Sequence, residues 1–185
     1  MRIIAGSAGS RKIEAPEGRD TRPTLDRVRE NIFNMIQFRL SGKNVLDLFT
    51  GSGAMSLESI SRGAESATMV DHSKKAYDVA CRNTKSLHFE KQCRILLMDY
   101  MKAIRLLESE SARFDLVFLD PPYEFSEHYE LLSQLDGLIR NEGIVVLEHA
   151  AGTEISYPKD RYSVDSRRNW GYCGITLIRK TGGSD

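Results

Sequence analysis

The feature of this sequence that most restricts its fold is a regular alternation of strand-like and helix-like segments from Lys43 onward. Short apolar runs fit buried strands, whereas the stretches between them carry apolar residues three and four positions apart. Such alternation is typical of an α/β fold, in which helices cover both faces of a parallel sheet. The predicted strands are Asn44–Phe49, Ser66–Val70, Cys93–Leu97, Phe114–Leu119 and Gly143–Leu147, and the predicted helices are Ala54–Arg62, Lys74–Leu87, Tyr100–Leu107 and Glu127–Ile139.

The pattern changes at both ends of the chain. After Leu147 two strand candidates, Arg161–Asp165 and Tyr172–Ile178, flank a polar turn at Ser166–Asn169 and predict a closing antiparallel hairpin. The fold class is therefore a Rossmann-like α/β domain with a mostly parallel seven-stranded sheet.

At the N-terminus, Arg2–Ala5 and Arg11–Glu14 flank a glycine-rich turn and predict a small β-hairpin. Pro23 and Thr24 then lead into a helix over Leu25–Leu40, with Thr24 at the capping position. A chain of 185 residues suits one core. We expect an appendage over residues 1–40, the main domain over 41–180 and a polar tail over 181–185.

Charge is balanced overall but uneven along the chain. Lys plus Arg equals Asp plus Glu at 26 each, so the net charge gives no evidence of a nucleic-acid partner, but both ends are basic. Three distant cysteines (Cys81, Cys93 and Cys173) match neither a zinc spacing nor a disulfide framework and favour a cytoplasmic protein. The apolar runs have strand length, so we expect no membrane segment.

The first predicted strand of the domain runs into a glycine turn, Thr50–Gly53, that opens the next helix. At such a place glycines let the backbone approach a ligand closely, and the helix N-terminus offers unpaired N–H groups. A lone glycine pair is most often an ordinary turn, but its place between a strand and a helix favours a nucleoside-bearing cofactor. A dinucleotide would require a third glycine where Ser56 stands, which disfavours an oxidoreductase.

Acidic residues end three successive predicted strands. Asp47 precedes the glycine turn, where a carboxylate suits the ammonium of a methionine moiety better than a pyrophosphate. Asp71 can accept hydrogen bonds from ribose hydroxyls, and Asp99 can reach an adenine amino group. Each alone fits a solvated strand end, whereas the three together indicate S-adenosylmethionine.

The most specific motif is Asp120-Pro121-Pro122-Tyr123, which follows the fourth strand. The prolines cannot extend a sheet ladder, so they hold the Asp120 carboxylate and the Pro121 carbonyl in set directions. Two such acceptors can grip the N–H bonds of an exocyclic amine on a base and aim its lone pair at a sulfonium methyl, while Tyr123 stacks on the base. The alternative is that the motif is only a rigid structural turn, for which the two prolines would be sufficient. The acid and the aromatic ring favour methyl transfer, for which no metal is required.

The segment Asp47-Leu48-Phe49-Thr50-Gly51-Ser52-Gly53, with Asp120-Pro121-Pro122-Tyr123, resembles the amino-methyltransferase branch of the Rossmann-like methyltransferases. Met1-Arg2-Ile3-Ile4-Ala5-Gly6, Arg22-Pro23-Thr24 and Arg27-Val28-Arg29-Glu30-Asn31-Ile32-Phe33-Asn34 resemble more narrowly the RsmD family. The resemblance covers nearly the whole chain. It implies methylation of guanine N2 in 16S ribosomal RNA, with the RNA or a small-subunit assembly intermediate as partner. We expect the enzyme to be a monomer.

The resemblance also implies site residues. Those that would bind the cofactor are Asp47, Phe49, Thr50, Gly51, Ser52, Gly53, Asp71, His72, Asp99, Tyr100 and Asp120. Those that would contact RNA are Arg2, Arg11, Lys12, Arg22, Arg27 and Arg29. The family often has Glu at the place of Asp71 and Ala at that of Thr50. Glu148 and His149, after the fifth strand, either line the target pocket or cap the strand.

Two other classes of function stay open from the residues. A DNA adenine-N6 or protein glutamine methyltransferase uses a similar acid-Pro-Pro-aromatic motif, and a non-catalytic RNA-binding assembly factor could keep the same fold. Methyl-transfer assays on RNA, DNA and protein distinguish the enzymes. Cofactor binding distinguishes the enzymes from the assembly factor.

Overall fold

The computed structural model describes residues 1–15, 23–122 and 124–182, with the backbone alone at 23–26. Its strands form a seven-stranded mixed sheet in the order β3-β2-β1-β4-β5-β7-β6. β2 pairs in parallel with β1 and β3, β4 pairs in parallel with β5, and β7 pairs antiparallel with β5 and β6. The predicted fold class, a mostly parallel sheet closed by an antiparallel hairpin, is confirmed.

The chain divides into two compact units, Met1–Tyr100 and Met101–Asp185. This division describes compactness alone, and the roles expected for residues 1–40 and 41–180 stay a prediction. No helix in the described ranges combines the length and the apolar character needed to cross a membrane.

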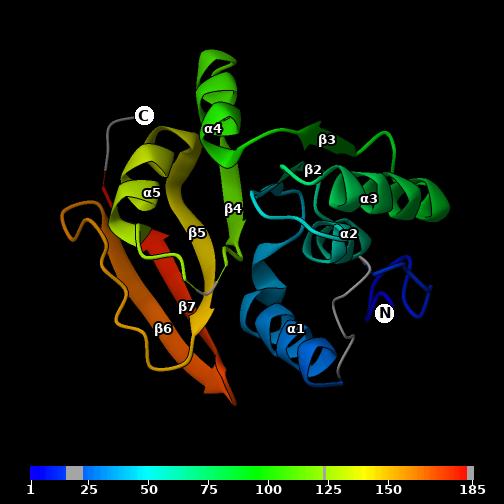
Figure 1. Ribbon diagram of the computed structural model, residues 1–185, viewed down its shortest axis with the longest axis horizontal. Helices are drawn as coiled ribbons and strands as arrows, with labels where there is room; N and C mark the ends of the chain where they lie inside the picture. The colour runs from blue at the N-terminus through cyan, green and yellow to red at the C-terminus, as the bar shows by residue number, and fades with distance from the viewer. Residues whose placement is uncertain (16–22, 123, 183–185) are drawn as a thin grey trace. The chain divides into compact units, whose positions relative to one another are not determined.

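The first unit contains three parallel strands with helices packed against them. α2 packs on β1 and β2, and α3 packs on β2 and β3 (Figure 1). Helix α3 begins where the Ser73 side chain accepts a hydrogen bond from the Ala76 N–H, and it ends at His88 in the left-handed conformation. The elements are α1 (Pro23–Ile36), a 3-10 turn η1 (Gln37–Arg39), β1 (Asn44–Asp47), α2 (Ala54–Ser61), β2 (Ser66–Asp71), α3 (Lys74–Leu87) and β3 (Cys93–Leu97).

The second unit holds the remaining strands. The apolar centre of β5 pairs with β4 on one side and β7 on the other, and this centre, β4 and β7 are almost entirely buried. Tyr162 of β6 is buried and donates its hydroxyl to the Leu132 carbonyl of α5 at 3.0 Å. Helix α4 (Tyr100–Ser109) begins at the last residue of the first unit and continues in the second. The other elements are β4 (Phe114–Leu119), α5 (His128–Leu135), a 3-10 turn η2 (Asp136–Leu138), β5 (Ile139–Ala150), β6 (Tyr162–Trp170) and β7 (Cys173–Lys180).

The predicted turn at Ser166–Asn169 is wrong, because these residues lie inside β6. They form the outer edge strand, whose exposed face accepts polar side chains. The chain reverses instead at Gly171, whose φ of +61° suits glycine. The polar run therefore marked an exposed strand and not a turn.

Several other boundaries shift, and the helix predicted over Glu127–Ile139 is wrong at its C-terminal end, because α5 ends at Leu135 and is followed by η2 and then by β5. The N-terminal hairpin is reduced to one antiparallel bridge, Arg2 with Lys12, with flanking backbone hydrogen bonds such as Ile3 N–H to the Arg11 carbonyl at 3.0 Å. The first helix ends at Ile36 and continues as η1. β5 begins at Ile139 and not at Gly143, and its register with β4 is interrupted before Ile144.

Candidate cofactor site and catalytic motif

The glycine turn between β1 and α2 has the backbone geometry that the sequence predicted. Gly51 and Gly53 adopt φ values of +53° and +81°, where other residues are strained. The Gly53 N–H donates to the Thr50 carbonyl at 2.8 Å, and Gly53 is the N-cap of α2. The turn thus presents the N-terminal end of a helix beside the end of β1.

Asp47 ends β1 as a buried carboxylate, 3% exposed. Its Oδ2 accepts hydrogen bonds from the hydroxyls of Thr50 at 2.9 Å and Ser56 at 3.1 Å. Burial raises the pKa of Asp47 to about 6, although the two hydroxyls lower it and the nearby Asp71 carboxylate raises it. A buried carboxylate with a raised pKa favours a cation as its neighbour.

Ser56 stands where a dinucleotide turn would carry its third glycine, and the structure gives it a function of its own. Its hydroxyl is fully buried and holds the Asp47 carboxylate. The sequence indicated the missing glycine but not this contact, because a serine at the third position of a helix is ordinarily assigned to solvent or to a backbone group.

Asp71 ends β2 and supports the turn from a second side. Its Oδ2 accepts the Gly51 N–H at 2.9 Å, and its Oδ1 accepts the Ser73 N–H at 2.8 Å. Both oxygens thus hold backbone groups, and each keeps a further lone pair for another donor. The predicted ribose contact stays a prediction. The neighbouring His72 side chain is 82% exposed.

The other expected cofactor residues lie at the ends of the same three strands. Phe49 follows β1, and its ring centroid is 5.3 Å from that of Tyr100, the first residue of α4. Asp99 precedes Tyr100 and is exposed. Because β1, β2 and β3 are parallel neighbours, their carboxyl ends share one edge of the sheet, as the sequence predicted for Asp47, Asp71 and Asp99.

The catalytic motif follows β4 in the second unit. Asp120 is half-buried, Pro121 is buried and Pro122 is exposed, while Tyr123 lies outside the described residues. The Pro122 carbonyl accepts the Phe125 N–H at 2.8 Å, which closes a turn directly after the prolines. Asp120 thus directly follows the buried strand β4. That the two prolines hold its carboxylate and the Pro121 carbonyl in set directions stays a prediction.

Glu148 and His149 end β5 beside this motif, because Leu119 and Leu147 are partners in the β4–β5 register. The Cys173 thiol donates to Glu148 Oε1 at 3.4 Å, and its pKa is raised by burial, by Glu148 and by Asp120. His149 is buried, with Nδ1 2.8 Å from the Ala150 carbonyl and Nε2 2.9 Å from Thr176 Oγ1. Both ring nitrogens of His149 are engaged within the fold.

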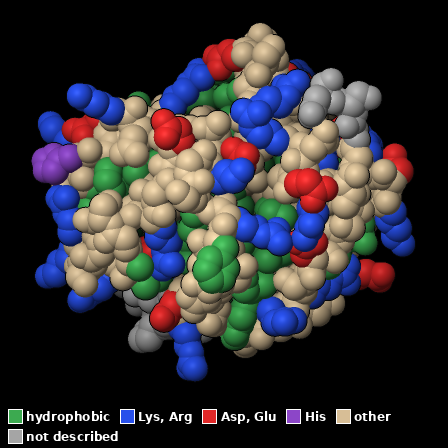
Figure 2. Space-filling model, turned by 180° about the vertical axis from the view of Figure 1, so that it is seen from behind, with side chains coloured by type: hydrophobic (Ala, Val, Ile, Leu, Met, Phe, Trp, Pro, Cys, Tyr) green, Lys and Arg blue, Asp and Glu red, His purple; other side chains and the backbone are tan. Residues whose placement is uncertain are grey.

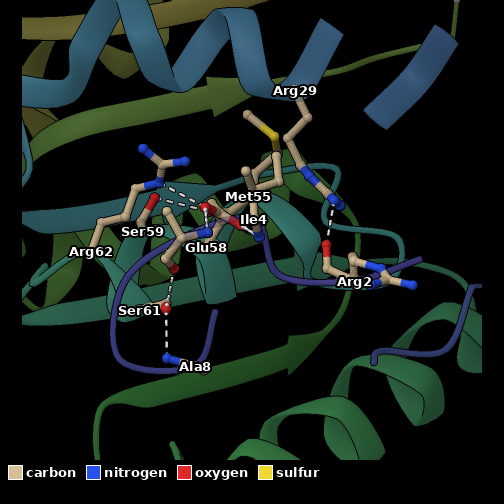
Figure 3. Close-up of polar contacts among 10 residues, drawn as sticks. Arg2, Ile4, Ala8, Arg29, Met55, Glu58, Ser59, Ser61 and Arg62 are labelled. Carbon is tan, nitrogen blue, oxygen red and sulfur yellow. Dashed lines mark hydrogen bonds and ion pairs between the residues drawn. The ribbon is translucent and has the colours of Figure 1, made fainter. Parts of the chain in front are cut away.

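The basic residues expected to contact RNA are of three kinds: exposed residues, residues that donate to the protein's own backbone, and one residue outside the described ranges. Arg2, Lys12 and Arg27 are exposed, whereas Arg29 is 6% exposed and donates to the Arg2 carbonyl (Figure 3). Arg11 is exposed, but its guanidinium donates to the carbonyls of Ser86 and Leu87 at the end of α3. Arg22 lies outside the described residues. On the face drawn in Figure 2, basic side chains are interspersed with acidic ones and do not gather in one patch.

Two polar residues of this region were missed by the sequence analysis. Glu58 of α2 and Asn83 of α3 are both buried. Asn83 was detectable, because it continues the apolar spacing of Ala76, Val79 and Leu87 along α3 and therefore had to face the interior. Glu58 gave no such signal, since a glutamate in a helix is ordinarily exposed.

The doubly wound sheet, with a glycine turn after β1 and an acidic proline motif after β4, defines a Rossmann-like class I methyltransferase fold. The solved structure of the Escherichia coli protein YhhF matches it with a TM-score of 0.84 and 26% identity over 98% of each chain. A family model described as "Conserved hypothetical protein 95" matches residues 1–178. The chain belongs to this family, the RsmD family of methyltransferases.

Two relatives illustrate the match. YlbH of Bacillus subtilis is 34% identical over 184 residues, which cover 98% of this chain and all of the relative. The Ribosomal RNA small subunit methyltransferase D of Escherichia coli K12 is 31% identical over 150 residues, which cover 80% of this chain and 74% of the relative.

Proposed function

We propose that this protein transfers a methyl group from S-adenosylmethionine to the N2 amino group of a guanine in small-subunit ribosomal RNA. The observation that carries the proposal is the Asp120-Pro121-Pro122 turn at the end of the buried strand β4. The polymer is suggested by the relatives named ribosomal RNA small subunit methyltransferase D, whereas the base, guanine, comes from the resemblance of the sequence motifs to the RsmD family.

The residues around the glycine turn fit this cofactor. The Asp47 carboxylate is buried with a raised pKa, which favours an ammonium over a phosphate as its partner. Gly51 and Gly53 leave no side chain between the turn and a ligand, and Asp71 offers carboxylate lone pairs for hydroxyl donors. S-adenosylmethionine, when bound, supplies a methyl group on a positively charged sulfur.

Asp120 and the Pro121 carbonyl act on the amine. An exocyclic amino group is weakly nucleophilic because its lone pair is delocalised into the base. Two acceptors on its N–H bonds turn the lone pair out of the ring plane and hold the nitrogen in line for attack. The N–CH3 bond forms as the S–CH3 bond breaks, the bonding pair stays on sulfur, and one amine proton passes to the Asp120 carboxylate.

The exposed basic residues of the N-terminal region provide the RNA contacts in this proposal. Arg2, Lys12 and Arg27 are available for phosphates, whereas Arg11 and Arg29 hold backbone carbonyls of the protein itself. The proposed RNA role of Arg29 is therefore indirect. It fixes the segment that presents Arg2.

The experiment measures tritiated methyl incorporation into small-subunit ribosomal RNA, small ribosomal subunits, DNA and protein. Asp120→Ala should lower turnover on the RNA substrate by about 100- to 1,000-fold while S-adenosylhomocysteine still binds. Glu124→Ala, an exposed acid of the same loop, is the matched control and should keep full turnover. Retained turnover in Asp120→Ala would remove the motif from the mechanism.

The comparison of RNA, ribosomal subunits, DNA and protein as substrates tests which polymer and which base are methylated. Mass mapping of the methylated nucleotide should give N2-methylguanine in the RNA. Methyl incorporation into DNA adenine or protein glutamine, with none into RNA, would replace the proposed substrate by one of these.

A further inference from the structure

Residues 1–15, here called the N-terminal segment, are held in the core of the first unit. Ile3, Ala8 and Ile13 are buried in one hydrophobic cluster with Leu57 of α2 and Met69 of β2. Fully burying an aliphatic side chain is strongly favourable. The segment is thus anchored against the same helix that begins at the glycine turn.

Helix α2 also binds the backbone of the segment through polar side chains (Figure 3). The buried Glu58 carboxylate accepts the Ile4 N–H at 2.7 Å and the Ala5 N–H at 3.0 Å, and Arg62 Nε donates to it at 2.6 Å. Ser61 Oγ donates to the Ala5 carbonyl at 2.6 Å and accepts the Ala8 N–H at 2.9 Å. These contacts fix the first part of the segment to α2.

Asn83 connects the last part of the segment to the glycine turn itself. Its Oδ1 accepts the Glu14 N–H at 2.7 Å, and its Nδ2 donates to the Glu14 carbonyl at 2.9 Å. The second Nδ2 hydrogen goes to the Ser52 carbonyl, also at 2.9 Å. The side chain is 2% exposed, and its two donors are both used.

The turn is therefore held on two sides. Asp71 accepts from the Gly51 N–H, and Asn83 donates to the Ser52 carbonyl one residue later. The Asp71 contact comes from the end of β2, whereas the Asn83 amide that donates to Ser52 is also paired with Glu14, so one side chain joins the turn to the N-terminal segment.

We infer that Asn83 is a positioning residue that couples the N-terminal segment to the cofactor turn, so that RNA binding to the segment tightens cofactor binding. The inference rests on the proposed function for the identity of the two ligands. RNA that engages Arg2 and Lys12 binds the docked segment in preference to an undocked one. RNA binding thereby favours the state in which Asn83 holds the Ser52 carbonyl, and in this state the glycine turn has the conformation to which the cofactor binds.

The experiment measures the Kd of S-adenosylhomocysteine by calorimetry, with and without a transcript of small-subunit ribosomal RNA. For the wild type, the RNA should lower this Kd by about fivefold or more, a usual size for coupled sites. Asn83→Ala should raise the Kd without RNA by about tenfold and should reduce the effect of RNA to less than about twofold. Asn83→Asp, which keeps the acceptor and removes both donors, should behave in the same way.

Arg82→Ala is the matched control. It removes the exposed ion pair between Arg82 and Glu14, which joins the same helix to the same segment without touching the glycine turn. Its Kd values and its response to RNA should stay within about twofold of the wild type. A purely structural role of Asn83 would lower the folded fraction and the number of binding sites, whereas the coupling changes Kd and the cofactor KM with little change in kcat.

If neither Asn83 variant folds, amide hydrogen exchange of Ser52 and Gly53 in the wild type tests the coupling directly, and RNA should slow it. Unchanged exchange, an unchanged wild-type Kd with RNA, or wild-type affinity in Asn83→Ala overturns the inference. Failure of the proposed function is a separate result, because it is measured as absence of methyl incorporation into RNA by the wild type.

Discussion

The buried Asp47 carboxylate makes a prediction that links stability to cofactor binding. Burial raises its pKa from 3.8 to about 6. Between these two pH values the folded protein binds more protons at this site than the unfolded chain does, so stability falls as the pH rises from about 4 to about 6. A pKa shift of about two units means that ionisation of the buried Asp47 lowers the free energy of unfolding by about 3 kcal/mol above pH 7.

Asp47→Asn removes the charge and keeps an oxygen that can accept the hydroxyls of Thr50 and Ser56. At pH 7.5 the ligand-free variant should be more stable than the wild type by up to about 3 kcal/mol. The new NH2 group must find an acceptor, which reduces this gain. Below pH 4 the advantage should disappear, because Asp47 is protonated there in the wild type. The melting temperature between about pH 3 and about pH 8 measures both effects.

The same substitution should weaken cofactor binding, because a charge-assisted hydrogen bond contributes about 1.5–3 kcal/mol, or roughly 10- to 100-fold in Kd. Calorimetric titration with S-adenosylhomocysteine at pH 7.5 measures it. In the wild type this affinity should also fall as the pH drops below about 6, as Asp47 takes up its proton.

Thr50→Val is the matched control for the carboxylate. It removes one hydrogen bond to the ionised form, raises the pKa of Asp47 further and should lower stability at pH 7.5. The hypothesis is that the buried charge of Asp47 lowers stability at neutral pH. It is refuted if Asp47→Asn is less stable than the wild type at pH 7.5 and its stability depends on pH in the same way.

Three further predictions concern buried groups. Glu58→Ala should lower the free energy of unfolding by about 3–5 kcal/mol in urea denaturation, because the Ile4 and Ala5 N–H groups and Arg62 lose their acceptor; a loss below 1 kcal/mol would contradict this. Gly53→Ala should cost about 1–2 kcal/mol and weaken cofactor binding, since its φ is +81° and a Cβ would lie 3.1 Å from Met69 Sδ; wild-type affinity in titration would contradict it. Lys180→Met should cost about 2–3 kcal/mol and leave cofactor affinity unchanged, because Nζ donates to the carbonyls of Asp136 and Ile139; chemical denaturation and titration test both parts.

Much of the fold could be predicted because the local signals agree with the tertiary structure. The predicted bounds of α3, β3 and β4 match the structure at every residue, since apolar periodicity and flanking polar residues define buried elements well. The polar run at Ser166–Asn169 misled the prediction because an exposed edge strand and a turn share the same composition. Only pairing with β7 distinguishes them.

The sequence by itself determined which residues are candidates for cofactor binding and catalysis. Glycines after a strand, acids at successive strand ends and two prolines after an acid are local requirements of backbone geometry, so Asp47, Gly51, Gly53 and Asp120 could be named without coordinates. Tertiary structure decided what surrounds them. The raised pKa of Asp47, the burial of Glu58 and the bridge from Glu14 through Asn83 to Ser52 depend on residues up to 69 positions apart in the chain, and burial and long-range contacts exist only once the chain has folded.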